Sequence, residues 1–461
     1  MSYRKPCSGF VTALVITTLF APSTLAASEG EGDGAPAELD ISGRVEASID
    51  QLEMEISKDE RAAIISTIES AREISRIAHK YNSPAHGDHY RRDAHAKATG
   101  CLRAEFEVNG DIPEPFQHSV FANPGRTYQA WIRFSNGDML VQPDGKGDAR
   151  GMAIKVMNAQ GLAIAPELGD GSEVTNQDFI MTNTPAFFNR NIFDYTENMQ
   201  HLAKLDRQGW FVSLWPPRLH LKEMFRAYQT VSSKIDTPLA EQYFSMLPYR
   251  LGETAVKFSS RPCAGTDYAT TADRSADDYL TRQMSATLDS GSACFEFMVQ
   301  PRNSAKSDAI EQDLPLDDAT VIWNEDIAPF VPVARIHIPP QAFTSSAQQN
   351  FCENLSMNPW RGVGEWEPLG SLNRARRLVY HAVSEFRHQR NEAPIEEPAS
   401  WCVPGAEEPC TPQQGLNIRK PTWPLPRCFD GLFRPLDGSP ASSQCEGYGG
   451  ELAERGSEPS Y

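Results

Sequence analysis

The hydrophobic and polar positions change period along the chain, and each change predicts a different element. Between residues 59 and 81 apolar residues recur every three or four positions, which predicts an amphipathic helix. Apolar and polar residues then alternate in five short runs, which predicts strands with one buried face. These runs are 102–108, 128–134, 152–156, 295–299 and 334–338.

Two further segments complete the predicted pattern. Residues 194–250 are rich in aromatic side chains and predict mostly helical structure, and residues 372–390 predict a second amphipathic helix. Clean alternation is typical of antiparallel sheets that have one solvated face. The pattern therefore favours an α+β fold built on an antiparallel barrel or sandwich over one built on a parallel sheet.

The N-terminus has the features of a secretory signal peptide. Arg4 and Lys5 precede an apolar run at 10–20, and small residues at 23–26 offer a cleavage site. We therefore expect residues 1–26 to be removed and the protein to be exported, to the periplasm or beyond the cell. The acidic stretch 27–45 predicts a disordered linker that leads into an N-terminal helical segment at 46–84.

Charge and cysteine content narrow the classes of function. The formal net charge of −18 repels phosphate backbones and anionic membranes, which argues against a nucleic-acid partner. Beyond the signal peptide no run of about 18 apolar residues predicts a membrane span. Of the nine cysteines only Cys7 lies in the signal peptide, and the even remainder is compatible with disulfides in an oxidising compartment. Local candidates in the Pro- and Cys-rich tail at 393–461 are Cys402 with Cys410 and Cys428 with Cys445.

The late helix carries the first candidate chemistry. Arg376, Tyr380 and Arg387 are spaced four and seven residues apart, so they share one helical face. An arginine one turn from a tyrosine favours the anionic phenolate, which is a hard ligand suited to ferric iron. On spacing alone, a solvated helix face is the more common explanation of such a stripe.

Three earlier segments also carry polar groups among apolar ones. His95 lies in the segment 92–97, Arg133 and Ser135 end a predicted strand, and Asn183 opens a polar turn that runs into paired aromatics. Each has a structural alternative, because single histidines, alternating arginines and paired aromatics are commonly part of the scaffold.

In sequence order these segments resemble the catalase family. The family pattern is Arg-x-x-His-Ala-Lys, then Val-Arg-Phe-Ser, then Asn-Thr-Pro-x-Phe-Phe, then Arg-x-x-x-Tyr followed by a further Arg. The matching segments here are 92–97, 132–135, 183–188 and 376–387, and 148–155 and 323–325 resemble further family motifs. The resemblance covers residues 85–392. It implies a catalase-like antiparallel β-barrel with surrounding helices and a proximal haem-ligand helix.

The resemblance also implies roles for individual residues. Tyr380 would be the axial ligand of haem b, with Arg376 keeping it ionised, and His95 would be the distal acid and base, oriented by Ser135. The residues expected to neutralise the haem propionates are Arg92, Arg133 and Arg387. Either Phe193 or Tyr195 would stack on the porphyrin.

The distal pocket leaves the reaction open. Catalases place an asparagine two positions before the Thr-Pro pair, where this chain has Thr182, and Asn183 follows directly. Either residue could therefore face the peroxide. Three hypotheses follow: a haem hydroperoxidase with peroxidase or weak catalase activity, a lipid hydroperoxide isomerase, and a haem-binding protein without turnover. The first would act on hydrogen peroxide or organic hydroperoxides with an unknown electron donor, and a homo-oligomer is compatible with all three.

Overall fold

The computed structural model describes residues 56–404, except for 169–174, 215–216, 267, 269–272 and 304–306. These residues all belong to one unit, Ile41–Tyr461. The signal peptide, the acidic linker and the cysteines at 410, 428 and 445 therefore lie outside the described residues.

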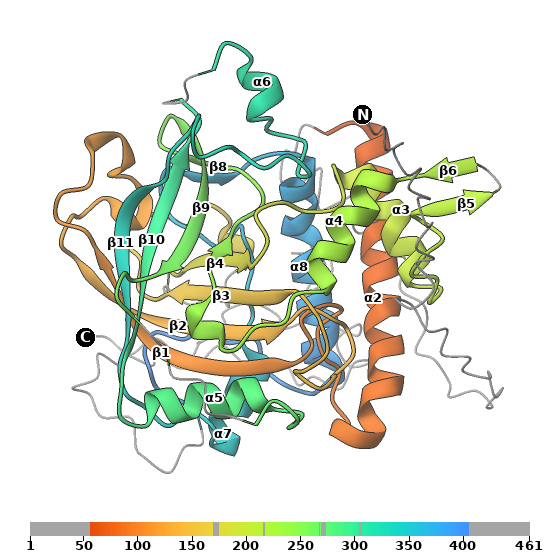
Figure 1. Ribbon diagram of the computed structural model, residues 1–461, viewed down its shortest axis with the longest axis horizontal. Coiled ribbons are helices and arrows are strands. Elements are labelled where there is room, and N and C mark those ends of the chain that lie inside the picture. The colour runs from red at the N-terminus through yellow and green to blue at the C-terminus, as the bar shows by residue number, and fades with distance from the viewer. Residues whose placement is uncertain are drawn as a thin grey trace, which may run out of the picture. The chain divides into compact units, whose positions relative to one another are not determined.

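An antiparallel sheet curls into a closed barrel of eight strands (Figure 1). Around the barrel the order is β10-β11-β1-β2-β3-β4-β7-β9, and β9 pairs again with β10 to close it. The strands are β1 (Ala98–Val108), β2 (Thr127–Asn136), β3 (Arg150–Val156), β4 (Gln177–Thr182), β7 (Tyr243–Phe244), β9 (Thr254–Pro262), β10 (Ala293–Pro301) and β11 (Val331–Ile338). The predicted α+β class with an antiparallel barrel is confirmed.

Shorter strands extend or flank the barrel. β8 (Tyr249–Leu251) and β12 (Trp366–Pro368) continue the sheet beyond β9, whereas β5 (Val212–Leu214) and β6 (Pro217–Leu219) form a separate hairpin. Residues 194–250 are thus less helical than predicted. Aromatic side chains favour strands as well as buried helix faces, so this composition did not distinguish the two.

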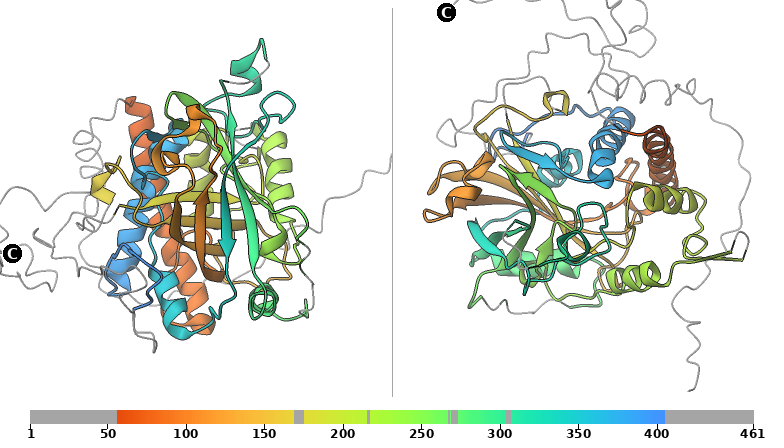
Figure 2. Two further views of the ribbon diagram at one scale, coloured as in Figure 1. Left: turned by 90° about the vertical axis from the view of Figure 1, so that its left-hand side faces the viewer. Right: turned by 90° about the horizontal axis from the view of Figure 1, so that it is seen from above.

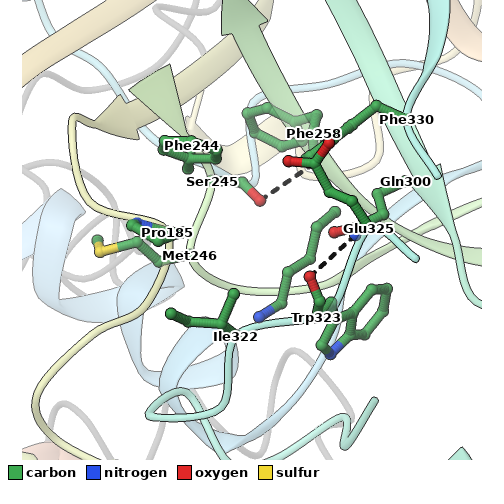
Figure 3. Close-up of a pocket in the computed structure, with 11 residues that line it drawn as sticks. Pro185, Phe244, Ser245, Met246, Phe258, Gln300, Ile322, Trp323, Glu325 and Phe330 are labelled. Atoms are coloured by element: carbon green, nitrogen blue, oxygen red, sulfur yellow. Dashed lines mark hydrogen bonds between the residues drawn. The ribbon is translucent and has the colours of Figure 1, made fainter. Parts of the chain in front are cut away.

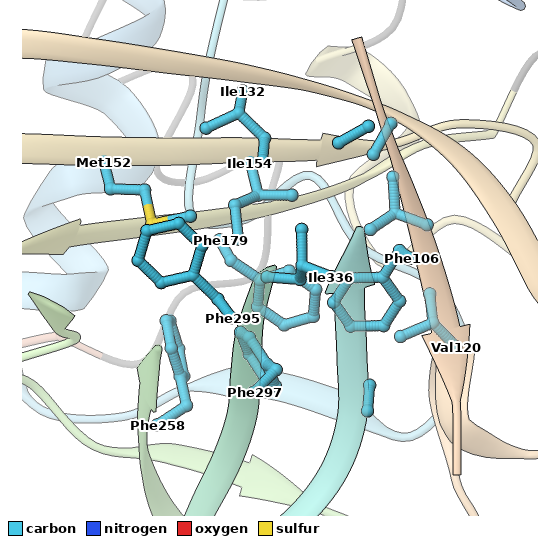
Figure 4. Close-up of a cluster of buried hydrophobic side chains, with 14 of the residues drawn as sticks. Phe106, Val120, Ile132, Met152, Ile154, Phe179, Phe258, Phe295, Phe297 and Ile336 are labelled. Carbon is cyan, nitrogen blue, oxygen red and sulfur yellow. The ribbon is translucent and has the colours of Figure 1, made fainter. Parts of the chain in front are cut away.

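Alternating side chains fill the barrel with aromatic rings. Phe106, Phe179 and Phe297 are fully buried, and the ring centroids of Phe179 and Phe297 lie 4.7 Å apart. Figure 4 shows these rings meeting side chains from strands on every side of the interior. A barrel packed in this way is a rigid wall, and functional groups must lie outside it.

Helices pack on the outside of this wall. They are α2 (Lys58–His86), α3 (Ile192–Leu202), α4 (Leu221–Val231), α5 (Tyr279–Leu288), α6 (Ile310–Asp313), α7 (Ser346–Asn354) and α8 (Ser371–Arg390). α2, α3 and α8 form a helical layer with its own apolar core, and Figures 1 and 2 show α2 beside α8. Every residue of the apolar stripe predicted on α8 is buried, from Leu372 to Phe386. None of the described helices is long and apolar enough to cross a membrane.

A buried ion network fastens later segments to the barrel's outer surface. The ammonium of Lys155 on β3 lies 2.8 Å from Asp178 and 2.9 Å from Glu397, and its side chain is fully buried. Arg361 contacts the same two carboxylates at 2.7 and 2.9 Å. Two cations thus balance two anions away from water.

Replacing Lys155 should therefore destabilise the fold. Because it leaves buried carboxylates undercompensated, we expect Lys155→Met to lower the free energy of unfolding by about 3–5 kcal/mol. The matched control is Arg261→Met, which breaks a largely exposed pair with Glu296 and should cost less than about 1 kcal/mol. Urea unfolding at neutral pH measures both, and equal losses would contradict a special role for the buried network.

Candidate functional site

Tyr380 and Arg376 form a hydrogen-bonded pair on α8. The Nη2 of Arg376 donates to the Tyr380 hydroxyl at 3.1 Å, and the guanidinium carbon lies 4.9 Å from the tyrosine ring centroid. Nη1 donates to the hydroxyl of Tyr249 at 3.3 Å and to Asn373 at 2.9 Å. Burial alone would lower the pKa of Arg376, but Tyr380 and Tyr249 raise it. Arg376 therefore stays charged beside Tyr380.

The start of α8 is fixed by a residue from another segment. The carboxylate of Asp317 accepts hydrogen bonds from the backbone and hydroxyl of Ser371, each at 2.7 Å. Gly370 precedes the helix with a positive φ of 86°, and a Cβ there would lie 2.7 Å from a backbone oxygen of Leu316. An acidic cap satisfies free amides at a helix start, so the register of Tyr380 is set by this junction.

His95 occupies a constrained position just before β1. Its φ of 57° lies in the left-handed region, which is unfavourable for a residue other than glycine. Its backbone amide donates to Gly137, and its carbonyl accepts from the Nη2 of Arg133 at 2.9 Å. Its Nδ1 lies 3.0 Å from the Ser135 hydroxyl. Burial, followed by the charges of Arg133 and Arg92, lowers the pKa of His95 to about 4, so the imidazole is neutral at pH 7.

A row of neighbouring residues across three strands faces His95. Ser135 on β2 is opposite Gly151 on β3, and Gly151 is opposite Thr182 on β4. A Cβ on Gly151 would lie 2.7 Å from the Nδ1 of His95 and 2.8 Å from the Ser135 hydroxyl. Directly opposed residues present their side chains on the same sheet face, so Thr182 shares the face of His95.

Asn183 is engaged elsewhere. Its side-chain oxygen accepts from the backbone amide of Arg150 at 2.8 Å, and its amide nitrogen donates to Ser233 at 3.0 Å. The Thr182 hydroxyl lies 3.1 Å from that of Thr184. Of the two alternatives in the sequence, Thr182 and not Asn183 therefore shares the sheet face of His95.

Four arginines gather where the barrel wall meets α8. We call Arg91, Arg92, Arg133 and Arg387 the arginine cluster. At its centre the carboxylate of Glu353 on α7 lies 3.4 Å from Arg91, 3.5 Å from Arg92 and 3.9 Å from Arg133. Arg387 donates to the backbone carbonyl of Glu353.

The arginine cluster has more positive charge than its acidic neighbours compensate. Burial and then Arg133 and Arg387 lower the pKa of Arg92. Burial would raise the pKa of Glu353, but Arg133 and Arg92 lower it. In the described part of the chain, the buried Nε atoms of Arg91, Arg133 and Arg387 and the Nη1 of Arg92 have no hydrogen-bond partner. Such a cluster is suited to an anionic group with several oxygens.

Tyr195 and Asp93 link Tyr380 to the arginine cluster, because Tyr195 interacts electrostatically with Tyr380 and with Asp93, and Asp93 interacts with two arginines of the cluster. Burial, the charge of Asp93 and the proximity of Tyr380 raise the pKa of Tyr195. Burial raises the pKa of Asp93 to about 6, against the opposing charges of Arg92 and Arg387. Phe193, by contrast, is 45% exposed. The proximity of Tyr195 to Tyr380 favours Tyr195 over Phe193 as the aromatic residue of the site.

Sequence reasoning missed Arg91, Gly151 and Glu353 as functional candidates of this site. Gly151 lies inside a motif that the sequence analysis noted. Its role follows from its position opposite Ser135 and Thr182 in the sheet, and that position is known only once the strand register is known. Glu353 lies in α7, for which the sequence predicted no element, so no signal pointed to it.

A separate pocket lies between β7, β9 and the segment 322–330 (Figure 3). Phe244, Phe258 and Phe330 make one side mostly apolar, and Ile322, Trp323 and Glu325 form another. Its lining contains none of the site residues expected from the sequence. The pocket is therefore distinct from the His95 and Tyr380 side chains.

The protein is an antiparallel barrel with a candidate site on its outer face. The site combines a Tyr–Arg pair on a helix, a neutral histidine and an arginine cluster, and these are suited to an anionic cofactor. Residues 79–211 match the family model described as Catalase. The chain is 26% identical over 332 residues to a catalase of Capsicum annuum, covering 67% of this chain and 62% of the relative. It is 25% identical over 290 residues to catalase isozyme 1 of Solanum lycopersicum, covering 58% and 54%. In sequence the chain is thus similar to catalases, which confirms the resemblance predicted from its motifs.

Solved catalases also align with this chain. A bacterial catalase has a TM-score of 0.48 and 16% identity, with 80% of this chain and 73% of the other covered. Catalase A from Saccharomyces cerevisiae has a TM-score of 0.47 and 17% identity, with 80% and 75% covered. The chain spans less than two thirds of the length of its curated relatives.

The depressed pKa of His95 predicts a specific loss of stability in acid. Its folded-state pKa of about 4 lies below the ordinary value of 6.5, so between these pH values only the unfolded chain takes up the proton. Stability should therefore fall as pH drops from 6.5 to 4, by up to about 3 kcal/mol from this group. His95→Gln removes the titration, so its unfolding free energy should vary less with pH across that window. Parallel curves for the two proteins would show that His95 titrates normally.

Proposed function

We propose that this protein is a haem-dependent hydroperoxidase that acts on hydrogen peroxide or organic hydroperoxides. The observation that carries the proposal is the arrangement of two polar pairs around one arginine cluster. Tyr380 with Arg376 lies on α8, and His95 with Ser135 lies against β2. Arg133 and Arg387 reach Glu353 from these two sides.

The residues present fit a haem b group. Its two propionates would satisfy the buried guanidinium nitrogens of the arginine cluster that lack a hydrogen-bond partner among the described residues. Tyr380 would hold the haem iron through its phenolic oxygen, to which Arg376 donates a hydrogen bond at 3.1 Å. When bound, the haem iron would supply a Lewis acid and a redox centre for the oxygen–oxygen bond.

His95 would move the proton. Because its imidazole is neutral, it can accept the proton from one peroxide oxygen and return it to the other, which turns a poor leaving group into water. Ser135 holds Nδ1 and leaves Nε2 for the peroxide. Gly151 leaves the space that this orientation needs.

Thr182 favours peroxidase or weak catalase activity over efficient disproportionation. Its hydroxyl offers one short hydrogen bond where catalases present a longer amide. Thr184 and Met246 already compete for it, at 3.1 and 3.2 Å. A second peroxide is therefore held less firmly, and an external donor would deliver the reducing electrons.

Export fits the cysteine chemistry of the folded chain. Cys263 and Cys294 form a disulfide that links the end of β9 to β10, and Cys402 is also disulfide-bonded. Disulfides persist in oxidising compartments, which supports the signal peptide expected at residues 1–26. We propose a periplasmic or secreted location on this basis.

Substitution of Tyr380 tests the haem assignment. We expect the full-length protein to take up haem with an iron–tyrosinate absorption spectrum, and Tyr380→Phe to lose that spectrum because no phenolate remains. The matched control is Tyr249→Phe, which removes another hydroxyl on Arg376 and should keep the spectrum. An unchanged spectrum in Tyr380→Phe excludes this ligand, and the absence of haem uptake by the wild-type protein refutes the proposal.

Substitution of Thr182 tests the reaction type. We expect the wild-type holoprotein to oxidise an organic donor with peroxide faster than it releases oxygen. Thr182→Asn should raise oxygen release relative to donor oxidation, and a tenfold rise would correspond to about 1.4 kcal/mol of transition-state stabilisation. Conversion of a fatty-acid hydroperoxide without a donor would instead indicate an isomerase. Haem binding without any turnover would indicate a binding protein.

A further inference from the structure

Two buried thiols lie side by side behind the arginine cluster. Cys101 on β1 and Cys352 on α7 are only 4% and 2% exposed and pack in the same apolar cluster, close enough for each thiol to shift the pKa of the other. They come from segments about 250 residues apart in the sequence, joined here by the packing of α7 on β1. In the described ranges these two are the cysteines that remain as thiols.

We propose that Cys101 and Cys352 form a peroxide-oxidised dithiol, in which hydrogen peroxide or a small organic hydroperoxide converts the pair to a disulfide between β1 and α7. This site is separate from Tyr380 and His95. It takes from the proposed function only the chemical class of its oxidant, and the step requires no haem.

The arginine cluster makes the two thiols unequal. Arg133 lies directly opposite Cys101 in the pairing of β1 with β2, and Arg92 donates to the Cys352 carbonyl at 3.4 Å. Burial would raise the pKa of Cys352, but its hydrogen bond with Cys101 and the charge of Arg133 lower it. Burial and the same hydrogen bond raise the pKa of Cys101. Cys352 therefore has the lower thiol pKa of the two, so the proposal assigns it the attack on the peroxide and assigns Cys101 the resolving step.

The chemistry balances in two steps. The sulfur of Cys352 attacks one peroxide oxygen, the oxygen–oxygen bond breaks, and the products are a sulfenic acid and water, or an alcohol from an organic hydroperoxide. The sulfur of Cys101 then attacks the sulfenic sulfur, forms the disulfide and releases water. Two thiols are oxidised by two electrons and one hydroperoxide is reduced by two.

The surroundings favour closure of the pair. Trp131, Leu355 and Val403 pack around the thiols and exclude bulky competing thiols such as glutathione. The Gln348 side chain donates to the Cys101 carbonyl at 2.7 Å and holds α7 against β1. A sulfenic acid at Cys352 would therefore meet Cys101 before any external thiol.

Timed alkylation tests the proposal on the full-length protein. The protein is reduced, freed of reductant, treated with hydrogen peroxide, quenched with an alkylating reagent and mapped by peptide mass spectrometry. We expect the peptides of Cys101 and Cys352 to lose alkylation together and to appear as one disulfide-linked species. The wild-type measurement is decisive by itself, because full alkylation of both thiols after peroxide treatment would overturn the proposal.

Two serine variants assign the roles. Cys101→Ser should accumulate a sulfenic acid at Cys352 that a dimedone probe labels. Cys352→Ser should leave Cys101 oxidised at least about tenfold more slowly than Cys352 in the wild type, since the thiol pKa of Cys101 is the higher of the two. Equal rates would contradict the assigned order. Tyr380→Phe run in parallel should form the disulfide at the wild-type rate, so failure of the haem proposal remains distinguishable from failure of this one.

Discussion

Uncompensated positive charge between the barrel wall and α8 is the constraint on which the site depends. Four guanidiniums approach one another there, and Glu353 provides the carboxylate that lies among them. Burying like charges is unfavourable unless anions balance them. The arginine cluster therefore favours the binding of a further group with anionic oxygens. Together with burial, this charge lowers the pKa of His95, and together with the neighbouring Cys101 it lowers the pKa of Cys352. One electrostatic feature thus acts on the candidate general base, on one thiol of the cysteine pair and on the candidate anion site.

The barrel fixes the positions of the site residues around this charge. Its interior is packed with phenylalanine rings, so the wall cannot shift easily and its outer face holds fixed positions. On that face the register places Ser135, Gly151 and Thr182 in one row across three strands. A one-residue slip would turn all three side chains to the other face. The orientation of His95 therefore depends on the register of the sheet.

The sequence predicted what depends on local pattern and missed what depends on distant contacts. Alternation identified five of the eight barrel strands (β1, β2, β3, β10 and β11) but missed β4, β7 and β9. The three- and four-residue period identified α2 and α8, because buried faces impose these periods directly. Motif order indicated Tyr380, Arg376, His95 and Ser135. Glu353 and the Cys101–Cys352 pair could not be found in this way, since their neighbours come from segments far away in the chain. The choice between Thr182 and Asn183 also needed the strand register, which no local pattern specifies.

Helix α7 links the two chemistries of the molecule. Cys352 and Glu353 are consecutive residues of α7. A bond that fixes the backbone at Cys352 therefore also restricts the position of Glu353. A disulfide from Cys352 to β1 would hold α7 against the barrel and keep Glu353 among the arginines. That would stabilise the arginine cluster when peroxide is abundant and leave α7 freer when it is scarce. Glu353 competes with an incoming anion for the same guanidiniums, so the redox state of the thiols would bias how readily the cluster accepts one.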